Sequence, residues 1–174
     1  MYDTSDIGKF KVDVVKKKVK KINPFSKINI IKKKITSANL SKIINKFDIL
    51  VDGSDNFKTK FLLNDYSVKY KKVLIVGAIS KFDGHIFSFN FKNYKEPCLR
   101  CFYQSEPSDE LLNCETEGIV GTVANIIGGI QANEVLKNIL DIKNDLDSSI
   151  LIIDLLKLNF RKVNFKKKSK CICF

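Results

Sequence analysis

Hydrophobic and polar positions follow one another in blocks that predict alternating helices and strands. Residues 8–22 place Val and Ile side chains on one face of a helix and lysines on the other. Asn23 and Pro24 end this pattern, and the apolar positions of residues 27–31 then predict a short strand. Residues 37–46 predict a second helix. The chain is therefore predicted to begin with a helix, a strand and a helix.

A short apolar run at residues 48–52 predicts a buried strand that ends in the polar loop 52–56. Residues 56–70 continue with a helical pattern, and residues 73–76 form a second apolar strand. Strands that are separated by helices pair in parallel through right-handed crossovers. This part of the chain therefore predicts an α/β fold, with a mostly parallel sheet and helices on both faces.

The second half of the chain predicts a less regular arrangement. Residues 82–90 alternate as a half-exposed strand does, which also fits antiparallel pairing, and residues 94–118 are irregular. Residues 122–140 predict a long helix that is apolar on most sides and rich in small residues, suited to the core or to a dimer interface. Residues 149–155 and 158–165 predict a closing hairpin, so the C-terminal part of the sheet is predicted to be antiparallel.

Two carboxylates, Asp52 and Asp55, lie at the predicted carboxyl end of the first buried strand. In open α/β sheets, ligands bind outside this end of the strands, so both acids are placed to face a ligand or its metal. The alternative is that Ser54 or Asp55 only caps the following helix. The spacing alone favours the cap.

Four of the five cysteines form two close pairs, and they are Cys98, Cys101, Cys171 and Cys173. Two such pairs suit a tetrahedral zinc site, because Zn²⁺ accepts four thiolate ligands. Thiols without a metal and a redox pair are the alternatives. A closed four-cysteine site would do no catalysis and would staple segment 94–104 to segment 166–174.

Two further side chains stand alone in the sequence. Cys114 lies in a polar loop before the long helix, where it is either an exposed nucleophile with a lowered pKa or an ordinary free cysteine. His85 is the only histidine, on an aromatic strand face that favours a core or rim position, so no role is assigned to it. No glycine-rich phosphate-binding motif is visible.

Length, charge and composition bear on the number of domains and on whether the chain binds nucleic acid, is secreted or enters a membrane. The chain has 174 residues, the size of one domain, and a formal net charge of +12. Only two basic residues are Arg, and the lysines cluster at 16–21, 32–34 and 166–170 with few aromatic residues between them. These clusters favour solvated faces over a nucleic-acid site. Neither a secretory signal nor an apolar run long enough to span a bilayer is visible, so a cytoplasmic protein is expected.

Seven short motifs occur in an order that is characteristic of one family. They are Asp6-Ile-Gly-Lys-Phe-Lys11, Asn23-Pro24, Val51-Asp-Gly-Ser-Asp-Asn56, Gly77-Ala-Ile-Ser80, Pro97-Cys-x-x-Cys101, Cys114-x-x-x-Gly-Ile-Val-Gly121 and Ile127-Gly-Gly-Ile-Gln-Ala-x-Glu134. Through them the chain resembles, over essentially its whole length, the ThiF/MoeB/HesA family of ubiquitin-activating-enzyme-like adenylyltransferases. The resemblance implies a single domain over 1–174, corresponding to the C-terminal portion of the family domain.

The resemblance also implies a function. Members of this family bind ATP and Mg²⁺ and adenylate the C-terminal glycine of a ubiquitin-like sulfur-carrier protein, in molybdopterin or thiamine biosynthesis or a related thiolation. The implied fold is Rossmann-like with a four-cysteine zinc site, and the implied assembly is a homodimer. A cysteine desulfurase or rhodanese is the implied sulfur donor. Neither a membrane nor a nucleic acid is an implied partner.

Four residues match functional positions of the family. Lys11 matches its ATP-contacting lysine, and Asp55 matches the acid near the triphosphate and Mg²⁺. Lys60 stands where many relatives have an Arg, and Cys114 matches a cysteine that in some relatives forms a covalent link to the carrier. The resemblance thus assigns Asp55 and Cys114 to catalysis, and Lys11, Asp55 and Lys60 to cofactor binding.

The front of the family pattern has no counterpart in this chain. A G-x-G-G-x-G loop, a ribose-binding acid and an Arg-containing helix would precede the position of Met1. Without that loop the phosphates lack their usual helix N-terminus. The favoured explanation is a fragment or truncated gene product. A partner chain that supplies the missing half, or a loss of catalysis that leaves a zinc-stapled module binding a carrier or dimer partner, are the alternatives.

Overall fold

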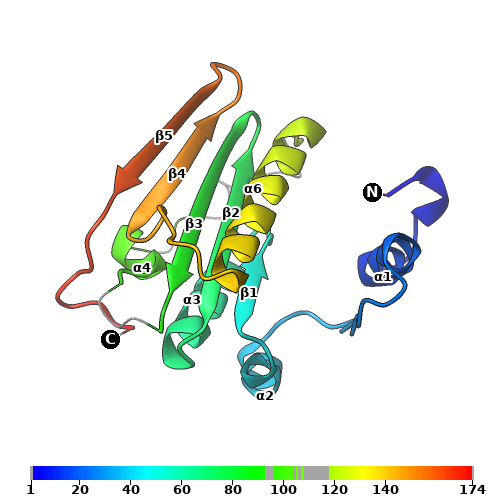
Figure 1. Ribbon diagram of the computed structural model, residues 1–174, viewed down its shortest axis with the longest axis horizontal. Helices are drawn as coiled ribbons and strands as arrows, with labels where there is room; N and C mark the ends of the chain where they lie inside the picture. The colour runs from blue at the N-terminus through cyan, green and yellow to red at the C-terminus, as the bar shows by residue number, and fades with distance from the viewer. Residues whose placement is uncertain (1, 93–95, 104, 106, 108–117, 174) are drawn as a thin grey trace. The chain divides into compact units, whose positions relative to one another are not determined.

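The computed structural model describes residues 2–92, 96–103, 105, 107 and 118–173. It divides into two compact units, Met1–Ile35 and Thr36–Phe174, which are treated separately below. Figure 1 shows the chain coloured by residue number. Among the described residues, no helix combines the length and the apolar character that crossing a bilayer requires.

The first unit consists of a 3₁₀ turn, η1 (Thr4–Asp6), and helix α1 (Lys11–Ile22). The amphipathic helix predicted at residues 8–22 is therefore confirmed. The strand predicted at residues 27–31 is wrong, since this segment has no strand assignment. A strand needs a neighbour for its backbone N–H and C=O groups, and an apolar run by itself does not supply one.

The second unit is built on a mixed sheet in which the strand order equals the chain order. The five strands are β1 (Ile49–Asp52), β2 (Val73–Ser80), β3 (Asp83–Asn90), β4 (Ser149–Asp154) and β5 (Asn159–Asn164). Among the named strands of the described residues, β1 and β2 pair in parallel and the later pairs are antiparallel.

The mostly parallel sheet that the sequence predicted is therefore wrong, whereas the antiparallel C-terminal part is confirmed. The reason lies in the connections. Helix α3 (Phe57–Lys69) crosses over between β1 and β2, but a tight turn at Lys81 and Phe82 joins β2 to β3. Lys81 has a φ of 49°, and so short a link permits only antiparallel neighbours.

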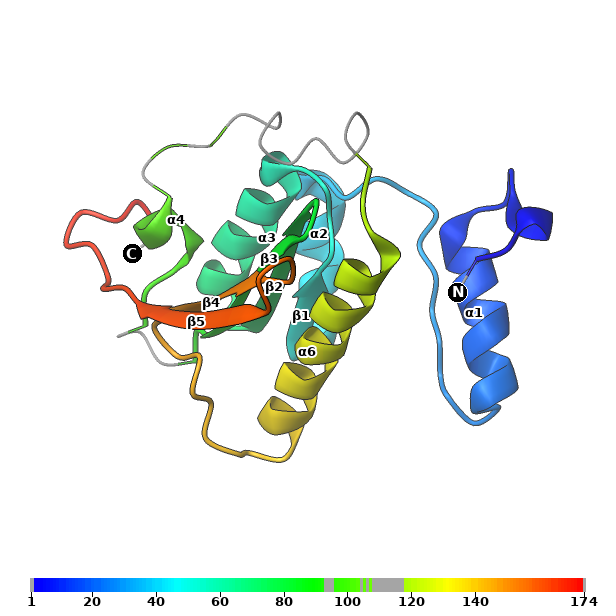
Figure 2. The same cartoon turned by 90° about the horizontal axis from the view of Figure 1, so that it is seen from above.

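Helices cover both faces of this sheet. Besides the turn η2 (Ile44–Lys46), they are α2 (Ser37–Ile43), α3 (Phe57–Lys69), α4 (Leu99–Phe102) and α6 (Gly121–Ile139). Figure 2 shows α3 and α4 on one side of the sheet and α6 on the other. The prediction of helices on both faces is confirmed.

Two apolar cores lie on the two faces. The core under α3 and α4 is aromatic and contains Phe57, Phe61, Phe87, Phe89 and Phe91. The core under α6 is smaller and aliphatic and contains Ile86, Val123, Ile127, Leu146 and Ile153. Strand β3 contributes to both, so it is mostly buried. The half-exposed strand predicted at residues 82–90 is wrong in this respect, because helices from distant parts of the sequence cover both of its sides.

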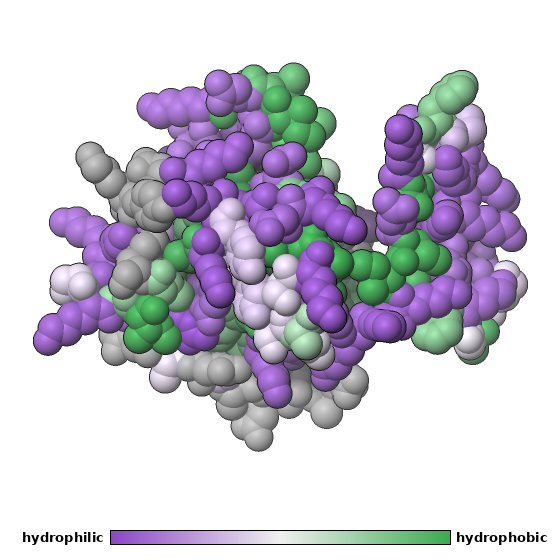
Figure 3. All heavy atoms as spheres, turned by 90° about the horizontal axis from the view of Figure 1, so that it is seen from below, coloured by the Kyte–Doolittle hydropathy of each residue, from purple (hydrophilic) through white to green (hydrophobic). Residues whose placement is uncertain are grey.

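Hydrophilic side chains cover much of the face that Figure 3 shows. Several lysines are paired on the surface of the first unit. Lys32 Nζ lies 2.6 Å from Asp13 Oδ2, and Lys18 lies 3.3 Å from carboxylate oxygens of both Asp3 and Asp6. Exposed pairs of this kind contribute little to stability, because water and salt screen their charges.

Candidate functional site

Hydrogen bonds of polar side chains shape the loop after β1, which the sequence predicted to be a polar loop at residues 52–56. Asp52 Oδ1 accepts a hydrogen bond from the Ser54 backbone N–H at 2.9 Å. The side chain of Asn56, not that of Ser54 or Asp55, caps α3, because its Oδ1 accepts the Thr59 backbone N–H at 2.8 Å. The prediction that Ser54 or Asp55 caps the helix is therefore wrong, and the exposed Asp55 carboxylate instead accepts a hydrogen bond from Asn56 Nδ2 at 3.1 Å.

A buried ion pair lies directly beneath this loop. Lys60 Nζ donates to Asp52 Oδ2 at 2.9 Å and to the Gly77 carbonyl oxygen at 2.7 Å. The Lys60 and Asp52 side chains are only 2% and 1% exposed. The ammonium group of Lys60 thus ties the ends of β1 and β2 to α3. The nucleotide contact predicted for Lys60 stays a prediction, and in this arrangement its charge is already matched by Asp52.

A cavity of about 240 Å³ opens between the carboxyl end of β1 and helix α6. Asp55 lines it from the loop, and Ala124 and Gly128 line it from the helix. These small residues leave space over the strand ends. The position fits the rule that ligands of α/β sheets bind outside the carboxyl ends of the parallel strands.

Gln131 closes the floor of this cavity, a role that sequence reasoning missed. Its Nε2 donates to the Asp52 carbonyl oxygen at 2.8 Å. A Cβ placed on Gly77 would lie 2.7 Å from the Gln131 side-chain amide, so Gly77 provides the space that Gln131 occupies. The sequence signal was a polar residue inside an apolar helix, which has to find a partner when it is buried.

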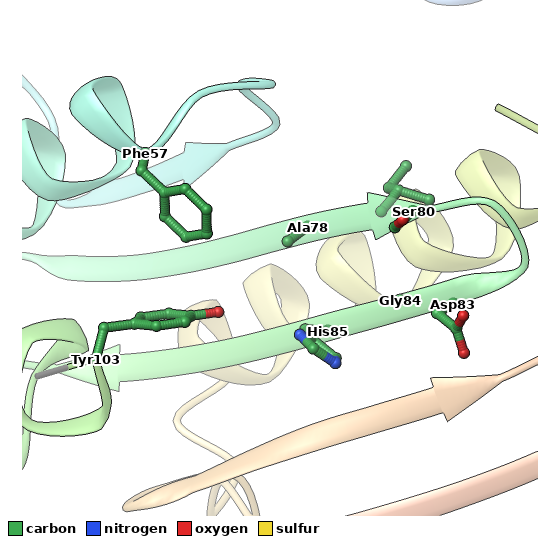
Figure 4. A pocket seen from close by; sticks show the side chains of 8 residues that line it. Phe57, Ala78, Ser80, Asp83, Gly84, His85 and Tyr103 are labelled. Atoms are coloured by element: carbon green, nitrogen blue, oxygen red, sulfur yellow. The ribbon is translucent and has the colours of Figure 1, made fainter. Parts of the chain in front are cut away.

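A second cavity, of about 260 Å³, lies on the other side of β2 (Figure 4). Phe57, His85 and Tyr103 line it together with the end of the β2–β3 hairpin. Ile79 borders both cavities, so the two lie next to each other at the end of β2. The aromatic rings of Phe57 and Tyr103 pack edge to face with centroids 5.3 Å apart.

His85 therefore stands in a cavity wall, within the rim position that its strand pattern favoured. Burial lowers the pKa of His85, and the nearby Asp83 carboxylate partly opposes this shift. Burial also raises the pKa of the Tyr103 hydroxyl. Both groups are neutral at pH 7, and the Asp83 side chain also lines the cavity, so the cavity suits a group that carries no negative charge.

The structure does not test the roles predicted for two other site residues, Lys11 and Cys114. Lys11 begins α1 in the first unit, where it lines a hollow with Lys32, Lys33 and Lys34. Cys114 lies outside the described residues. The roles predicted for both stay predictions.

The cysteines predicted as metal ligands do converge. The sulfur atoms of Cys98, Cys101 and Cys171 lie within 4.8 Å of one another, and all three residues are buried. Cys98 Sγ is 3.9 Å from Cys101 Sγ and 3.5 Å from Cys171 Sγ. Tetrahedral Zn–S bonds of about 2.3 Å would put the sulfurs roughly 3.8 Å apart, so the three thiols can hold Zn²⁺ with little movement.

Cys173 lies at the edge of this cluster. Hydrogen bonds from Cys173 and Cys171 lower the pKa of Cys98 to about 5, so Cys98 is a thiolate at neutral pH. The same bond to Cys98 raises the pKa of Cys173, and burial raises the pKa of Cys171 to about 11. One thiolate with thiol donors around it is a suitable starting point for binding a metal cation.

Comparison with known proteins gives a consistent family. The chain is 33% identical over 175 residues to the sulfur carrier protein adenylyltransferase of Thermus thermophilus, which covers 98% of this chain and 65% of that protein. It is 36% identical to the probable molybdopterin-synthase adenylyltransferase of Pyropia yezoensis, over 93% of this chain and 43% of that protein. The chain thus spans between about two fifths and two thirds of the length of these relatives.

Solved structures support the same fold. The crystal structure of Escherichia coli MccB with ATP matches 99% of this chain and 53% of its own, with a TM-score of 0.81 and 20% sequence identity. The ThiF family model matches residues 1–173. Together, the family model over nearly the whole chain and the adenylyltransferase relatives show that this protein belongs to the ThiF family.

Proposed function

We propose that this chain belongs to an ATP-dependent adenylyltransferase that activates the C-terminal glycine of a ubiquitin-like sulfur-carrier protein. The names of its relatives support this activity, and they favour molybdopterin synthesis or sulfur-carrier activation as its setting. The observation that carries the proposal is the Asp55-lined cavity at the carboxyl end of β1, next to the apolar cavity at the end of β2.

Adenylation needs groups that stabilise the negative charge of the phosphates in the cavity at the carboxyl end of β1. A carboxylate oxygen of the carrier attacks the α-phosphorus of ATP, the bond to the β-phosphate oxygen breaks, and pyrophosphate leaves with the electron pair. Asp55 is the acid proposed to hold Mg²⁺, which would neutralise charge on the phosphates. Lys11 is proposed to contribute a positive charge, Cys114 a covalent link to the carrier, and Lys60 a nucleotide contact, either direct or through the loop that its bond to Asp52 supports.

The apolar cavity would hold an uncharged part of the carrier tail. Tyr103 and His85 line it as neutral groups and offer no positive charge, and the Asp83 side chain also lines it, so the cavity would disfavour a carboxylate and leave room for small or apolar side chains. We further propose a homodimer in the cytoplasm, with a separate sulfur donor acting on the adenylated carrier.

The cysteine cluster is proposed to be structural. Cys98, Cys101, Cys171 and Cys173 would hold Zn²⁺, and the three sulfurs that already lie within 4.8 Å of one another support this. The metal would tie the C-terminal segment to α4. In Figure 1 that segment runs from β5 back toward α4.

Pyrophosphate exchange into ATP tests the activity. The chain is joined to the N-terminal half of a relative that carries the phosphate loop and is incubated with ATP, Mg²⁺, labelled pyrophosphate and a molybdopterin-type or thiamine-type carrier. Exchange that requires the carrier is expected. Asp55→Asn should abolish it, whereas Asp141→Asn, which changes an exposed acid after α6, should not.

Carrier binding that is equally strong with and without ATP, in the absence of any exchange, would contradict the enzyme. It would favour the non-catalytic, zinc-stapled binding module. The burial of the Lys60 charge against Asp52 is the structural observation in favour of that second function.

A further inference from the structure

Asn64 is an amide in the middle of α3 that is completely buried. Its Oδ1 accepts the backbone N–H of Leu99, the first residue of α4, at 2.9 Å. Its Nδ2 lies 3.6 Å from the sulfur of Cys173. One side chain thus touches both cysteine-bearing segments: the helix between Cys98 and Cys101, and the C-terminal pair.

The next residue, Asp65, repeats this connection. It accepts two hydrogen bonds from the Arg100 guanidinium, from Nε and from Nη2, each at 2.7 Å. The Cys173 thiol donates to Asp65 Oδ1 at 3.3 Å. Arg100 also lies over the ring of Phe61, with its guanidinium carbon 4.6 Å from the ring centroid. A bidentate pair of this kind fixes orientation as well as distance.

Cys173 needs these contacts to hold its sulfur near the cluster, because it is not one of the three cysteines whose sulfurs all lie within 4.8 Å of one another. Cys173 packs only partly buried against the aromatic core, and its neighbour Ile172 is 80% exposed and adds no apolar anchor beside it. The contacts to Asn64 and Asp65 are the polar ones that the structure gives the Cys173 sulfur besides its bond to Cys98. A polar side chain that is fully buried in a helix is costly unless it makes such bonds.

We propose that Asn64 and Arg100 are positioning residues for the metal. Asn64 holds α4 and Cys173 together, and Arg100 fixes Asp65 beside the same sulfur, so that the fourth thiol reaches the cation. Partners in the shell around the ligands typically change metal affinity by about 10–100-fold. This inference rests on the zinc site of the proposed function.

The test uses the full chain loaded with Co²⁺, whose thiolate-to-metal absorption reports the number of bound sulfurs, and with Zn²⁺ in competition with a chelator. Asn64→Leu keeps a side chain of similar size without the amide. We expect a Zn²⁺ affinity about 10–100-fold lower. Because one thiolate of four is lost, the thiolate-to-cobalt absorption should fall by roughly a quarter. Asn138→Leu on α6, which bonds only to its own helix at Glu134, is the matched control.

Arg100→Gln keeps the test decisive if Asn64→Leu does not fold. Arg100 is partly exposed, unlike the buried Asn64, so its substitution disturbs the core less. The chain has one other arginine, the exposed Arg161 on β5, for a charge-matched control. Arg100→Gln should speed zinc release several-fold and Arg161→Gln should not. Unchanged affinity and spectrum in folded Asn64→Leu, or identical release from the two arginine variants, would overturn the inference. A parent chain that binds neither metal would overturn the zinc site with it, whereas pyrophosphate exchange would still report on the proposed activity.

Discussion

Helix α3 serves two buried polar centres, and they are built differently. Lys60 and Asn64 are four positions apart, so they lie one above the other on the same side of the helix. Lys60 reaches Asp52 and the ends of β1 and β2, where positive and negative charge cancel. Asn64 reaches the Cys173 sulfur, which lies beside Cys98, whose pKa is lowered to about 5 by hydrogen bonds from Cys173 and Cys171. The first centre is complete within the protein, whereas the second is suited to receive a cation.

The largest effect is expected where the complete centre is broken. Lys60→Met leaves Asp52 buried without its partner, which should lower the free energy of unfolding by about 3–5 kcal/mol. Urea denaturation followed by circular dichroism measures this. Lys58→Met, which changes an exposed lysine on the same helix, is the control.

The double variant Asp52→Asn with Lys60→Met should recover part of this loss, since no unpaired charge remains. If Lys60→Met alone is as stable as the parent chain, the ion pair does not hold the strand ends together.

Metal removal tests the second centre. A chelator should lower the melting temperature, and zinc at a hundredfold excess over its dissociation constant should restore about 2.7 kcal/mol of stability. Cys98→Ser should show no such response, because it removes the cysteine in contact with both Cys101 and Cys171. Cys114→Ser, which changes the fifth cysteine, should respond like the parent chain. An equal response in Cys98→Ser would argue against the cluster as the metal site.

Gly77 joins the first centre to the cavity above it. A methyl group at Gly77 would meet the Gln131 amide at 2.7 Å and push it off the Asp52 carbonyl. Gly77→Ala should therefore cost about 1–3 kcal/mol in unfolding measurements. Gly128→Ala places a methyl group in open space on α6 and should cost nothing. Equal stability of the two variants would mean that Gln131 relaxes freely.

The smallest effect concerns pH. Burial lowers the pKa of His85 below its ordinary value of 6.5. As the pH falls, His85 is therefore protonated more readily in the unfolded chain than in the folded chain. The contribution of neutral His85 to the free energy of unfolding is complete above about pH 6.5 and is lost as the pH falls toward the pKa of the folded state. His85 is the only histidine, and His85→Gln should flatten the fall in stability between about pH 6.5 and 5. If His85→Gln leaves the pH dependence of stability unchanged, the imidazole is exposed to solvent and its pKa is not lowered by burial.

The sequence was most informative where local pattern and local structure coincide. The amphipathic helix at α1, the β1–α3–β2 unit and the β4–β5 hairpin follow from apolar periodicity and turn residues. The cysteine spacing anticipated the Cys98–Cys101–Cys171 cluster, because two close pairs need only one long-range contact to meet.

The failures share one cause. Residues 27–31 are apolar but have no strand partner, and β3 is buried on both sides although its pattern alternates. In both cases the outcome depends on what packs against the segment, and the segment itself does not contain this information. The helix cap shifted from Ser54 or Asp55 to Asn56 for a related reason, since Asp52 had already turned the loop.

The sequence by itself determined the elements, the family motifs and the residue types available for charge, thiol and carboxylate chemistry. Only the tertiary structure decided that Lys60 pairs with Asp52 and that Gln131 occupies the space left by Gly77. It also decided that Asn64 links two cysteine segments 73 residues apart. Buried polar groups must find partners, and in a folded chain those partners come from distant segments that no local pattern can identify.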